Sequence, residues 1–354
     1  MDQIGQIKPT LWVFTDWSPL NDFSDVYWRE CFYDEDFCQY TIKIIDGQYI
    51  NHESFLLGDL NFKHAQMKTL LNLFEKNDIK DGDIFVFANA WNYIAVPLTF
   101  FKYEFDLDIK MIGFWGNSLF NKSSSLSKRL KLKKEFGYNF EMSLFKSYDL
   151  NCFLCDDHFE TFKKRHGYSL NYDSGKVTGY PFEYLTRSIQ DCSKQDIIFI
   201  PYPIQDEVQS RIFKGIKGDH PEFTYVNSFL THKDRNKFRE LIKVSKFLFS
   251  SREFEHDPVL IYESMLNGVV PFIQNRYLYQ IIFHDDYLIP KLDINKRNKY
   301  LFMMRHKILI SNFFDLKIRK YDYWSSRAKQ DAIEIGKKYY SNDKFINELK
   351  QLTK

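Results

Sequence analysis

The chain has 354 residues, of which 44% are hydrophobic, and this is enough for two domains that each bury a core of their own. Its formal net charge of +2 excludes a strong attraction of the whole molecule to nucleic acid or to anionic membranes, so any such binding must be local. The five cysteines lack the spacing of a secreted disulfide scaffold, the first ten residues show no signal-peptide pattern, and no uncharged apolar run has transmembrane length. We therefore expect a cytoplasmic protein.

The first half of the chain alternates short apolar runs with helical patterns. Because these runs are apolar on both faces, they predict a parallel sheet that is covered by helices on both sides. Helical patterns lie between them, for example at 66–76 and 159–166. The predicted strands are 11–14, 83–88, 110–115, 152–155 and 176–179.

The same pattern restarts after the polar stretch 187–195. Apolar runs at 196–200, 223–226 and 246–250 again alternate with helical patterns, and they predict a second doubly wound α/β unit. The charged tail, 325–352, has apolar residues at helical spacing and predicts a helix.

The segment from Glu255 to Phe272 is the most informative in the chain. Seven residues separate Glu255, in a polar turn-like stretch, from Glu263, on an apolar helix that ends at Gly268. The helix begins near Pro258, and its unpaired backbone N–H groups favour an anion in the loop before it. Glu263, about two turns in, can still reach a ligand hydroxyl. The segment therefore predicts a site for a phosphorylated sugar donor.

Other polar residues follow predicted strands in the first half. In doubly wound folds, ligand sites lie beyond the carboxyl ends of the strands, so the loops after Phe14, Trp115 and Ser250 are candidates. Asp16 and Asn117 lie in two of these loops and are candidate ligand contacts, with turn capping as the alternative.

The segment from Glu255 to Pro271 resembles the donor motif of retaining glycosyltransferases of the two-Rossmann (GT-B) type, E-x7-E-A-M-A-x-G-x-x-P. Val177–Phe182 resembles the segment that closes their first domain, and Pro201–Gln209 stands where they open the second.

The resemblance implies an α/β fold of two Rossmann-like, doubly wound domains. The first, at 1–186, would bind the acceptor, and the second, at 187–324, would bind the donor. The C-terminal helix, at 325–354, would cross back to the first domain.

The resemblance also implies roles for single residues. Glu255 would lie near the reacting sugar, the residues after it would offer backbone N–H groups to the sugar and diphosphate, and Glu263 would hold the ribose. The donor would be a nucleotide sugar, with a UDP-sugar expected first, and no metal or other cofactor would be essential. The catalytic candidates are Glu255, Asp257 and Asn117. The donor-binding candidates are Glu263, His256, Pro258, Val259, Leu260, Arg252, Arg211 and Tyr202.

The chain departs from the family's pattern where the second domain begins. The family often carries an Arg and a Lys there to neutralise the donor diphosphate, but this chain has Gln205 and Val208 instead. Arg252 or Arg211 would then have to supply the charge. If neither reaches the diphosphate, the donor is not an ordinary nucleotide sugar or the protein is inactive.

The stretch 121–134 holds six cations and no acid, and it follows the Trp115 loop on the expected acceptor side. Such cations would contact DNA phosphates without reading sequence. Three leucines would equally make the stretch a helix at a membrane surface, and a solvated helix face is the remaining interpretation. The acceptor-binding candidates are Asp16, Trp17, Trp115, Asn117, Ser118, Lys128 and Arg129.

A looser resemblance, carried by 113–118 and 271–276, is to phage enzymes that glycosylate hydroxymethylated pyrimidines in DNA and to enzymes that mannosylate queuosine in tRNA. A hydroxymethylated pyrimidine in phage-type DNA is therefore the first acceptor that we expect. The alternatives are a bacterial surface polysaccharide or lipid-linked glycan, and a non-catalytic protein of the same fold that binds glycans or nucleotides.

Three residue pairs imitate metal ligands. Cys152 and Cys155 have partial zinc-site spacing, but no second pair follows, and free cysteines are common in buried strands. Asp81 and Asp83, like Asp106 and Asp108, precede strands and so stand at the wrong end for a site in this fold. We predict no metal site.

Overall fold

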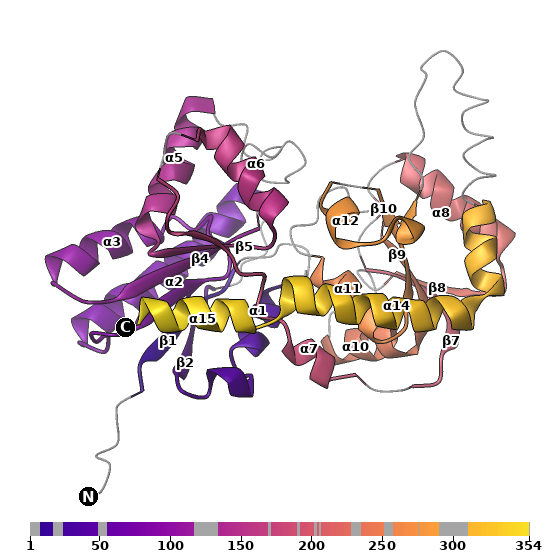
Figure 1. Ribbon diagram of the computed structural model, residues 1–354, viewed down its shortest axis with the longest axis horizontal. Coiled ribbons are helices and arrows are strands. Elements are labelled where there is room, and N and C mark those ends of the chain that lie inside the picture. The colour runs from indigo at the N-terminus through magenta and orange to yellow at the C-terminus, as the bar shows by residue number, and fades with distance from the viewer. Residues whose placement is uncertain are drawn as a thin grey trace, which may run out of the picture. The chain divides into compact units, whose positions relative to one another are not determined.

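The computed structural model (Figure 1) describes residues 8–16, 24–48, 55–116, 134–168, 171–189, 192–201, 204, 207–227, 235–250, 258–275, 277–289 and 311–353. The chain forms two compact units. The first unit comprises 1–184 together with 338–354, and the second comprises 185–337.

Within the described residues, the first unit has a six-stranded parallel sheet in the order β2-β1-β3-β4-β5-β6. Its inner strands are buried on both faces, as their continuous apolar runs predict. The edge strand β2 alternates exposed and half-buried side chains, and for this reason it gives no double-sided apolar run in the sequence. The strands are β1 (Thr10–Phe14), β2 (Thr41–Ile45), β3 (Ile84–Phe87), β4 (Lys110–Trp115), β5 (Leu150–Phe153) and β6 (Gly175–Val177).

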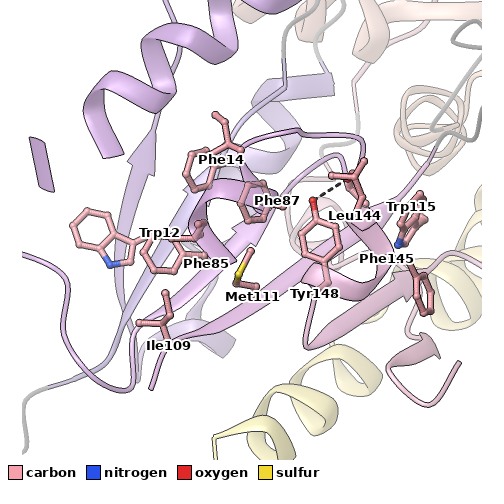
Figure 2. Close-up of a cluster of buried hydrophobic side chains, with 14 of the residues drawn as sticks. Trp12, Phe14, Phe85, Phe87, Ile109, Met111, Trp115, Leu144, Phe145 and Tyr148 are labelled. Atoms are coloured by element: carbon pink, nitrogen blue, oxygen red, sulfur yellow. Dashed lines mark hydrogen bonds between the residues drawn. The ribbon is translucent and has the colours of Figure 1, made fainter. Parts of the chain in front are cut away.

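Helices cover this sheet, and aromatic side chains fill the space beneath them (Figure 2). The rings of Phe14 and Phe87, on neighbouring strands, stack with centroids 4.5 Å apart. The buried Tyr148 donates its hydroxyl hydrogen to the carbonyl oxygen of Ala90 over 2.8 Å, which satisfies its one polar atom. The helices of this unit include α1 (Ser24–Cys31), α2 (Phe55–Glu75), α3 (Ala95–Glu104), α5 (Lys134–Ser147), α6 (Asp156–His166) and α15 (Asp343–Leu352).

The C-terminal helix α15 belongs to the first unit. The ring of Phe345 packs against those of Phe32 and Phe114. The backbone N–H of Tyr180 donates to the carbonyl oxygen of Tyr339 over 2.8 Å. Gly179 makes this approach possible, because its φ is +69° and a Cβ there would lie 2.5 Å from the Tyr339 oxygen.

The second unit has, among its described residues, a five-stranded parallel sheet in the order β11-β10-β9-β7-β8. The strands are β7 (Gln195–Ile200), β8 (Thr224–Asn227), β9 (Ser245–Ser250), β10 (Val270–Gln274) and β11 (Leu288–Ile289). The helices include α7 (Tyr184–Arg187), which begins at the last residue of the first unit, α8 (Glu207–Asp219), α10 (Arg235–Val244), α11 (Val259–Leu266), α12 (Tyr277–Ile282) and α14 (Tyr321–Ile335).

The tail therefore divides between the units at Lys338 and not at Ser325. Helix α14, yellow in Figure 1, stays with the second unit because it packs on α11. Its Ser325 and Tyr321 hydroxyls donate to the carbonyl oxygen of Gly268 over 2.7 and 3.2 Å. The π-helical turn Gly336–Tyr340 then carries the chain into the first unit.

Two doubly wound α/β sheets confirm the fold class that the apolar runs predict. No helix in the described part of the chain is both long and apolar enough to cross a membrane.

Candidate functional site

The helix α11 has the local structure that its sequence predicts. It starts after Pro258, whose fixed φ suits the beginning of a helix, and it ends before Gly268, which has a φ of +75°. All eight of its side chains are buried, as its apolar sequence requires. The strand β10 follows at once, so the helix is anchored between α14 and the sheet.

Glu263 is the one carboxylate on α11, and it is 4% exposed. Its Oε1 accepts a hydrogen bond from Nε of Arg239, on α10, over 3.2 Å. Because burying a lone carboxylate is costly, the guanidinium offsets part of that cost and fixes the orientation of the Glu263 side chain. The sequence does not mark Arg239, because three other cations share its short helix.

The first turn of α11 carries apolar side chains, so its polar groups are those of the backbone. Val259 and Leu260 are buried, and their apolar side chains offer a ligand no polar contact. The N–H groups of Ile261 and Tyr262 both donate to the carbonyl oxygen of Pro258, over 3.0 and 3.1 Å. The side chain of Pro258 makes no capping bond.

Several predicted residues lie outside the described part of the chain, and they stay predictions. On the donor side these are Glu255, Asp257, His256, Arg252, Tyr202 and the side chain of Arg211. On the acceptor side they are Trp17, Asn117, Ser118, Lys128 and Arg129.

In the first unit, Asp16 lies just beyond the carboxyl end of β1, where the fold places ligand sites. Its Oδ2 accepts a hydrogen bond of 2.7 Å from Nδ2 of Asn89, which follows β3. The neighbouring Thr15 donates from Oγ1 to Oδ1 of Asp46, after β2, over 2.8 Å. The other oxygen of Asp46 lies 2.6 Å from Nη2 of Arg29.

A buried lysine completes this arrangement. Lys63 is 3% exposed, and its ammonium donates to Asp59 and to the carbonyl oxygen of Trp91, each over 3.0 Å. Burial by itself would lower the pKa of Lys63, but the Asp59 and Asp16 carboxylates raise it above its ordinary value. Asp16 and Lys63 therefore attract each other across the carboxyl edge of the sheet.

We name this group the carboxyl-edge cluster. It consists of Arg29, Asp46, Asp16, Asn89, Asp59 and Lys63. Only Asp16 was predicted from the sequence. Asp59 and Lys63 stand four residues apart on α2, a spacing that brings side chains together, and this signal could have marked them.

The structure corrects the expectation that Trp115 contacts an acceptor. Its side chain is wholly buried, and the indole Nε1–H donates to Oδ1 of Asn151 over 2.7 Å. The ring stacks on Phe153, 6.1 Å away between centroids (Figure 2 shows Trp115 among the core residues). Helices cover both faces of this inner strand, so its side chains lie in the core up to the last residue of the strand.

The residue pairs whose spacing resembles that of metal ligands include side chains with structural roles. Asp83 accepts hydrogen bonds from the backbone N–H of Thr10 and from the indole of Trp12. Cys152 and Cys155 are buried free thiols, and burial raises the pKa of each. Within the described ranges, no three His, Cys, Asp or Glu side chains are grouped as metal ligands.

Comparison with known proteins identifies the fold. The sequence matches no protein-family model and no curated protein. The structure is similar to a sucrose-phosphate synthase from Thermosynechococcus elongatus, with a TM-score of 0.58 and 8% identity over 97% of this chain and 98% of the other. It is also similar to WaaG, a glycosyltransferase involved in lipopolysaccharide biosynthesis, with a TM-score of 0.55 and 9% identity over 96% and 99%.

A pneumococcal O-GlcNAc transferase, GtfA, in complex with UDP and GlcNAc is a third similar structure, with a TM-score of 0.52 and 10% identity over 82% of this chain. The chain spans 60% of the length of that protein. These similarities show that the two doubly wound units together form the GT-B fold, as the donor motif predicts.

Proposed function

We propose that this chain, which has the GT-B fold, is a glycosyltransferase that moves a sugar from a nucleotide sugar to an acceptor hydroxyl with retention of configuration. The observation that carries the proposal is the Glu263–Arg239 pair on two helices of the second unit. The second carboxylate of the donor motif is thus buried and paired with a guanidinium, and a supporting contact of this kind holds a side chain in the orientation that ligand recognition needs.

Glu263 would read the nucleotide. Carboxylate oxygens accept hydrogen bonds from neighbouring hydroxyls, and a ribose offers two of them side by side. The Arg239 guanidinium holds Oε1 in one place, so the geometry of the carboxylate is set before the donor arrives. A UDP-sugar is the donor that we propose, with no metal required.

The diphosphate would lie before α11. Backbone N–H groups and the helix dipole at this end attract negative charge, and buried Val259 and Leu260 offer nothing that repels it. Arg252 and Arg211 remain the candidates for additional positive charge, with His256 and Tyr202 as further donor contacts. Glu255 or Asp257 would stabilise the positive charge that develops on the sugar, and the departing phosphate would take the acceptor proton.

The acceptor would be bound by the first unit. The carboxyl-edge cluster supports this assignment, because it gathers carboxylates, an amide and cations where doubly wound folds bind ligands. Asn117 remains the candidate for a catalytic contact, with Trp17 and Ser118 as further acceptor contacts.

A hydroxymethylated pyrimidine in DNA is the acceptor that we propose. The basic stretch 121–134 supports it, since Lys128, Arg129 and their neighbours would hold the phosphate backbone. Such binding predicts an affinity for duplex DNA that falls steeply with salt.

A lipid-linked or surface glycan is the second candidate, and exposed apolar residues favour it. Leu56, Leu57 and Leu60, on the first turns of α2, are each at least 40% exposed, and Phe136, two residues beyond the basic stretch, is 58% exposed. Apolar side chains together with cations would hold a protein at a membrane surface.

One sequence of experiments separates these functions. A thermal-shift screen of nucleotide sugars identifies the donor, and mass spectrometry then follows hydroxymethylated and plain DNA incubated with it. A mass increase of one sugar on hydroxymethylated DNA alone supports the DNA acceptor. Transfer to a lipid-linked glycan, with binding to anionic vesicles, supports the second candidate. A protein that binds no nucleotide sugar and hydrolyses none would refute glycosyl transfer.

A further inference from the structure

Three aromatic side chains of the first unit form a row that runs from the core to the surface. The rings of Phe136 and Phe140, one turn apart on α5, stack nearly parallel, with centroids 6.1 Å apart and planes inclined by 5°. The Phe140 ring meets that of Trp91 edge-on, with centroids 4.9 Å apart. Phe140 and Trp91 are partly buried against the core, whereas Phe136 is 58% exposed. The row therefore ends in an aromatic ring that a ligand can reach.

Hydrogen bonds hold the inner end of this row in place. The indole Nε1–H of Trp91 donates to Oε1 of Glu141 over 2.9 Å. Glu141 is wholly buried, and its other oxygen lies 3.0 Å from Nε2 of His166. The indole is anchored in this way, and the two phenyl rings pack on it in turn. Because the stack orients the Phe136 ring in advance, a ligand that stacks on the ring has little conformational entropy to remove.

The same row leads to the carboxyl-edge cluster. The backbone N–H of Trp91 donates to Oδ1 of Asn89 over 3.0 Å, and its carbonyl oxygen accepts from the Lys63 ammonium over 3.0 Å. Asn89 in turn donates to Asp16. Phe136 itself is on the first turn of α5, the helix that follows β4, so it also stands on the carboxyl side of the sheet. The exposed ring is thus joined through two aromatic neighbours to the residues that we propose for the acceptor.

The surroundings of Phe136 are polar and, in the sequence, basic. Apart from Phe136, every exposed side chain that the structure describes on α5 is polar: Glu135, Asn139, Ser143 and Lys146. This helix therefore has no exposed apolar face to insert into a bilayer. The stretch 121–134, with six cations and no acid, ends two residues before Phe136. Proteins bind single-stranded nucleic acid with this combination, in which cations attract the phosphates and bases stack on aromatic rings.

We propose that Phe136, supported by Phe140 and Trp91, is a stacking platform for an unpaired base of single-stranded DNA. Inside a duplex, neighbouring base pairs cover both faces of each base, so only an unpaired base can lie against the ring. The contact tolerates any sequence, because every base has a π-face. This inference rests on the proposed DNA acceptor, and it specifies that the DNA is bound as a single strand.

Binding of fluorescent oligonucleotides, followed by anisotropy without any sugar donor, tests the platform separately from glycosyl transfer. The probe is an oligothymidine of about 15 nucleotides, which is long enough to fill a single-strand site of one domain. The control probes are an abasic oligonucleotide of the same length, which has the same phosphates but no bases, and a duplex of the same length. The protein should bind oligothymidine several-fold more tightly than it binds the abasic strand.

Variants assign the difference to the exposed ring. Phe136→Ala should weaken the binding of oligothymidine about tenfold, because a stack between a base and an aromatic ring is lost, and should leave the binding of the abasic strand and of the duplex unchanged. Phe136→Trp keeps an aromatic face and should retain the affinity for oligothymidine. The matched control, Phe100→Ala, removes a 68% exposed ring from α3 in the same unit and should have no effect.

Several results would overturn the platform. They are a wild-type protein that does not bind oligothymidine, a Phe136→Ala variant that binds it unchanged, and a variant that loses affinity for the abasic strand to the same extent. Loss of binding to anionic vesicles in Phe136→Ala, with oligothymidine binding kept, would assign the ring to a membrane instead. None of these results touches the binding of nucleotide sugars. A protein that binds oligothymidine through Phe136 but binds no nucleotide sugar would keep the platform and refute glycosyl transfer.

Discussion

Arg239 Nε lies 3.2 Å from Oε1 of Glu263, which joins the middle of α10 to the middle of α11. The carboxylate is 5% exposed and the guanidinium 25%, so water screens this pair less than it screens a surface ion pair. If either side chain is removed, the other remains partly buried without its charged partner. The first two predictions follow from this loss.

Replacing Glu263 by Gln should weaken the binding of UDP by about 2 kcal/mol, because the carboxylate's charge-assisted bonds to ribose are lost. Isothermal titration calorimetry measures the affinities of both proteins for UDP and for 2′-deoxy-UDP. The wild-type protein should prefer UDP, and Glu263→Gln should bind both alike. The control is Glu334→Gln, at an exposed position on α14. A variant that keeps the full preference for UDP refutes the role of Glu263.

Replacing Arg239 by Ala should lower the free energy of unfolding by about 1–3 kcal/mol, since the buried carboxylate loses its charged partner. Urea unfolding measures this loss. The double variant Arg239→Ala/Glu263→Gln should lose less than the sum of the single changes. Strict additivity would mean that the two side chains do not stabilise each other. Arg319→Ala, at an exposed position, is the control.

Replacing Asp16 by Asn should lower kcat/KM for the acceptor about 10- to 100-fold, because the carboxyl-edge cluster loses a charge that faces Lys63. The affinity for the nucleotide should not change, since Asp16 belongs to the other unit. Steady-state kinetics with the acceptor found by mass spectrometry test the loss of kcat/KM. Calorimetry tests whether the affinity for the nucleotide is unchanged. Asp78→Asn, exposed in the same unit, provides the comparison. Full activity of Asp16→Asn would count against an acceptor site at this edge.

Replacing Trp115 by Phe should destabilise the first unit by about 1–3 kcal/mol, because Oδ1 of Asn151 is left buried without its donor. Activity per folded molecule should be preserved, since the indole is a core group. Urea unfolding and kinetics on the same sample separate the two effects. If activity falls while stability is kept, the earlier expectation that Trp115 contacts the acceptor is the better one.

Replacing Lys317 by Met should stabilise the protein most below about pH 8. Burial lowers the pKa of Lys317 from 10.5 to about 8, although its ammonium lies 3.5 Å from the ring centroid of Phe313. Below pH 8 the folded protein bears the full cost of the buried charge, and as pH rises from 8 towards 10.5 the folded state releases this proton first, so the cost disappears.

Urea unfolding of Lys317→Met at pH 7, 8, 9 and 10 tests this dependence, with the exposed Lys320→Met as the control. The gain in stability should shrink as pH rises. A variant that is less stable than the wild type at pH 7 would mean that attraction to the aromatic rings outweighs burial.

The sequence predicts those parts of the fold that are local. The strands β1, β3 and β9 follow from continuous apolar runs, and α11 follows from Pro258 and Gly268, because single residues set these boundaries. The edge strand β2 leaves no such run.

The site is less predictable, because its partners come from distant segments. The sequence predicts Asp16 as a site residue because it comes directly after a strand, and it predicts Glu263 because it belongs to the donor motif. The sequence does not predict Arg239 and Asn89, because only the folded chain brings Arg239 to Glu263 and Asn89 to Asp16. For Trp115 the prediction from the sequence is wrong in the opposite direction. The residue stands next to a candidate loop in the sequence, but its side chain is buried in the core.

The path of the C-terminal tail delays the completion of the first unit during synthesis. Domains commonly fold as they emerge, the N-terminal one first. Here the second unit is one continuous segment, 185–337, whereas the first unit includes 338–354. The Tyr339 carbonyl and the Phe345 ring complete its core only after those residues have been made. The first unit, although its sheet is translated first, therefore cannot complete its core until its last helix has been made.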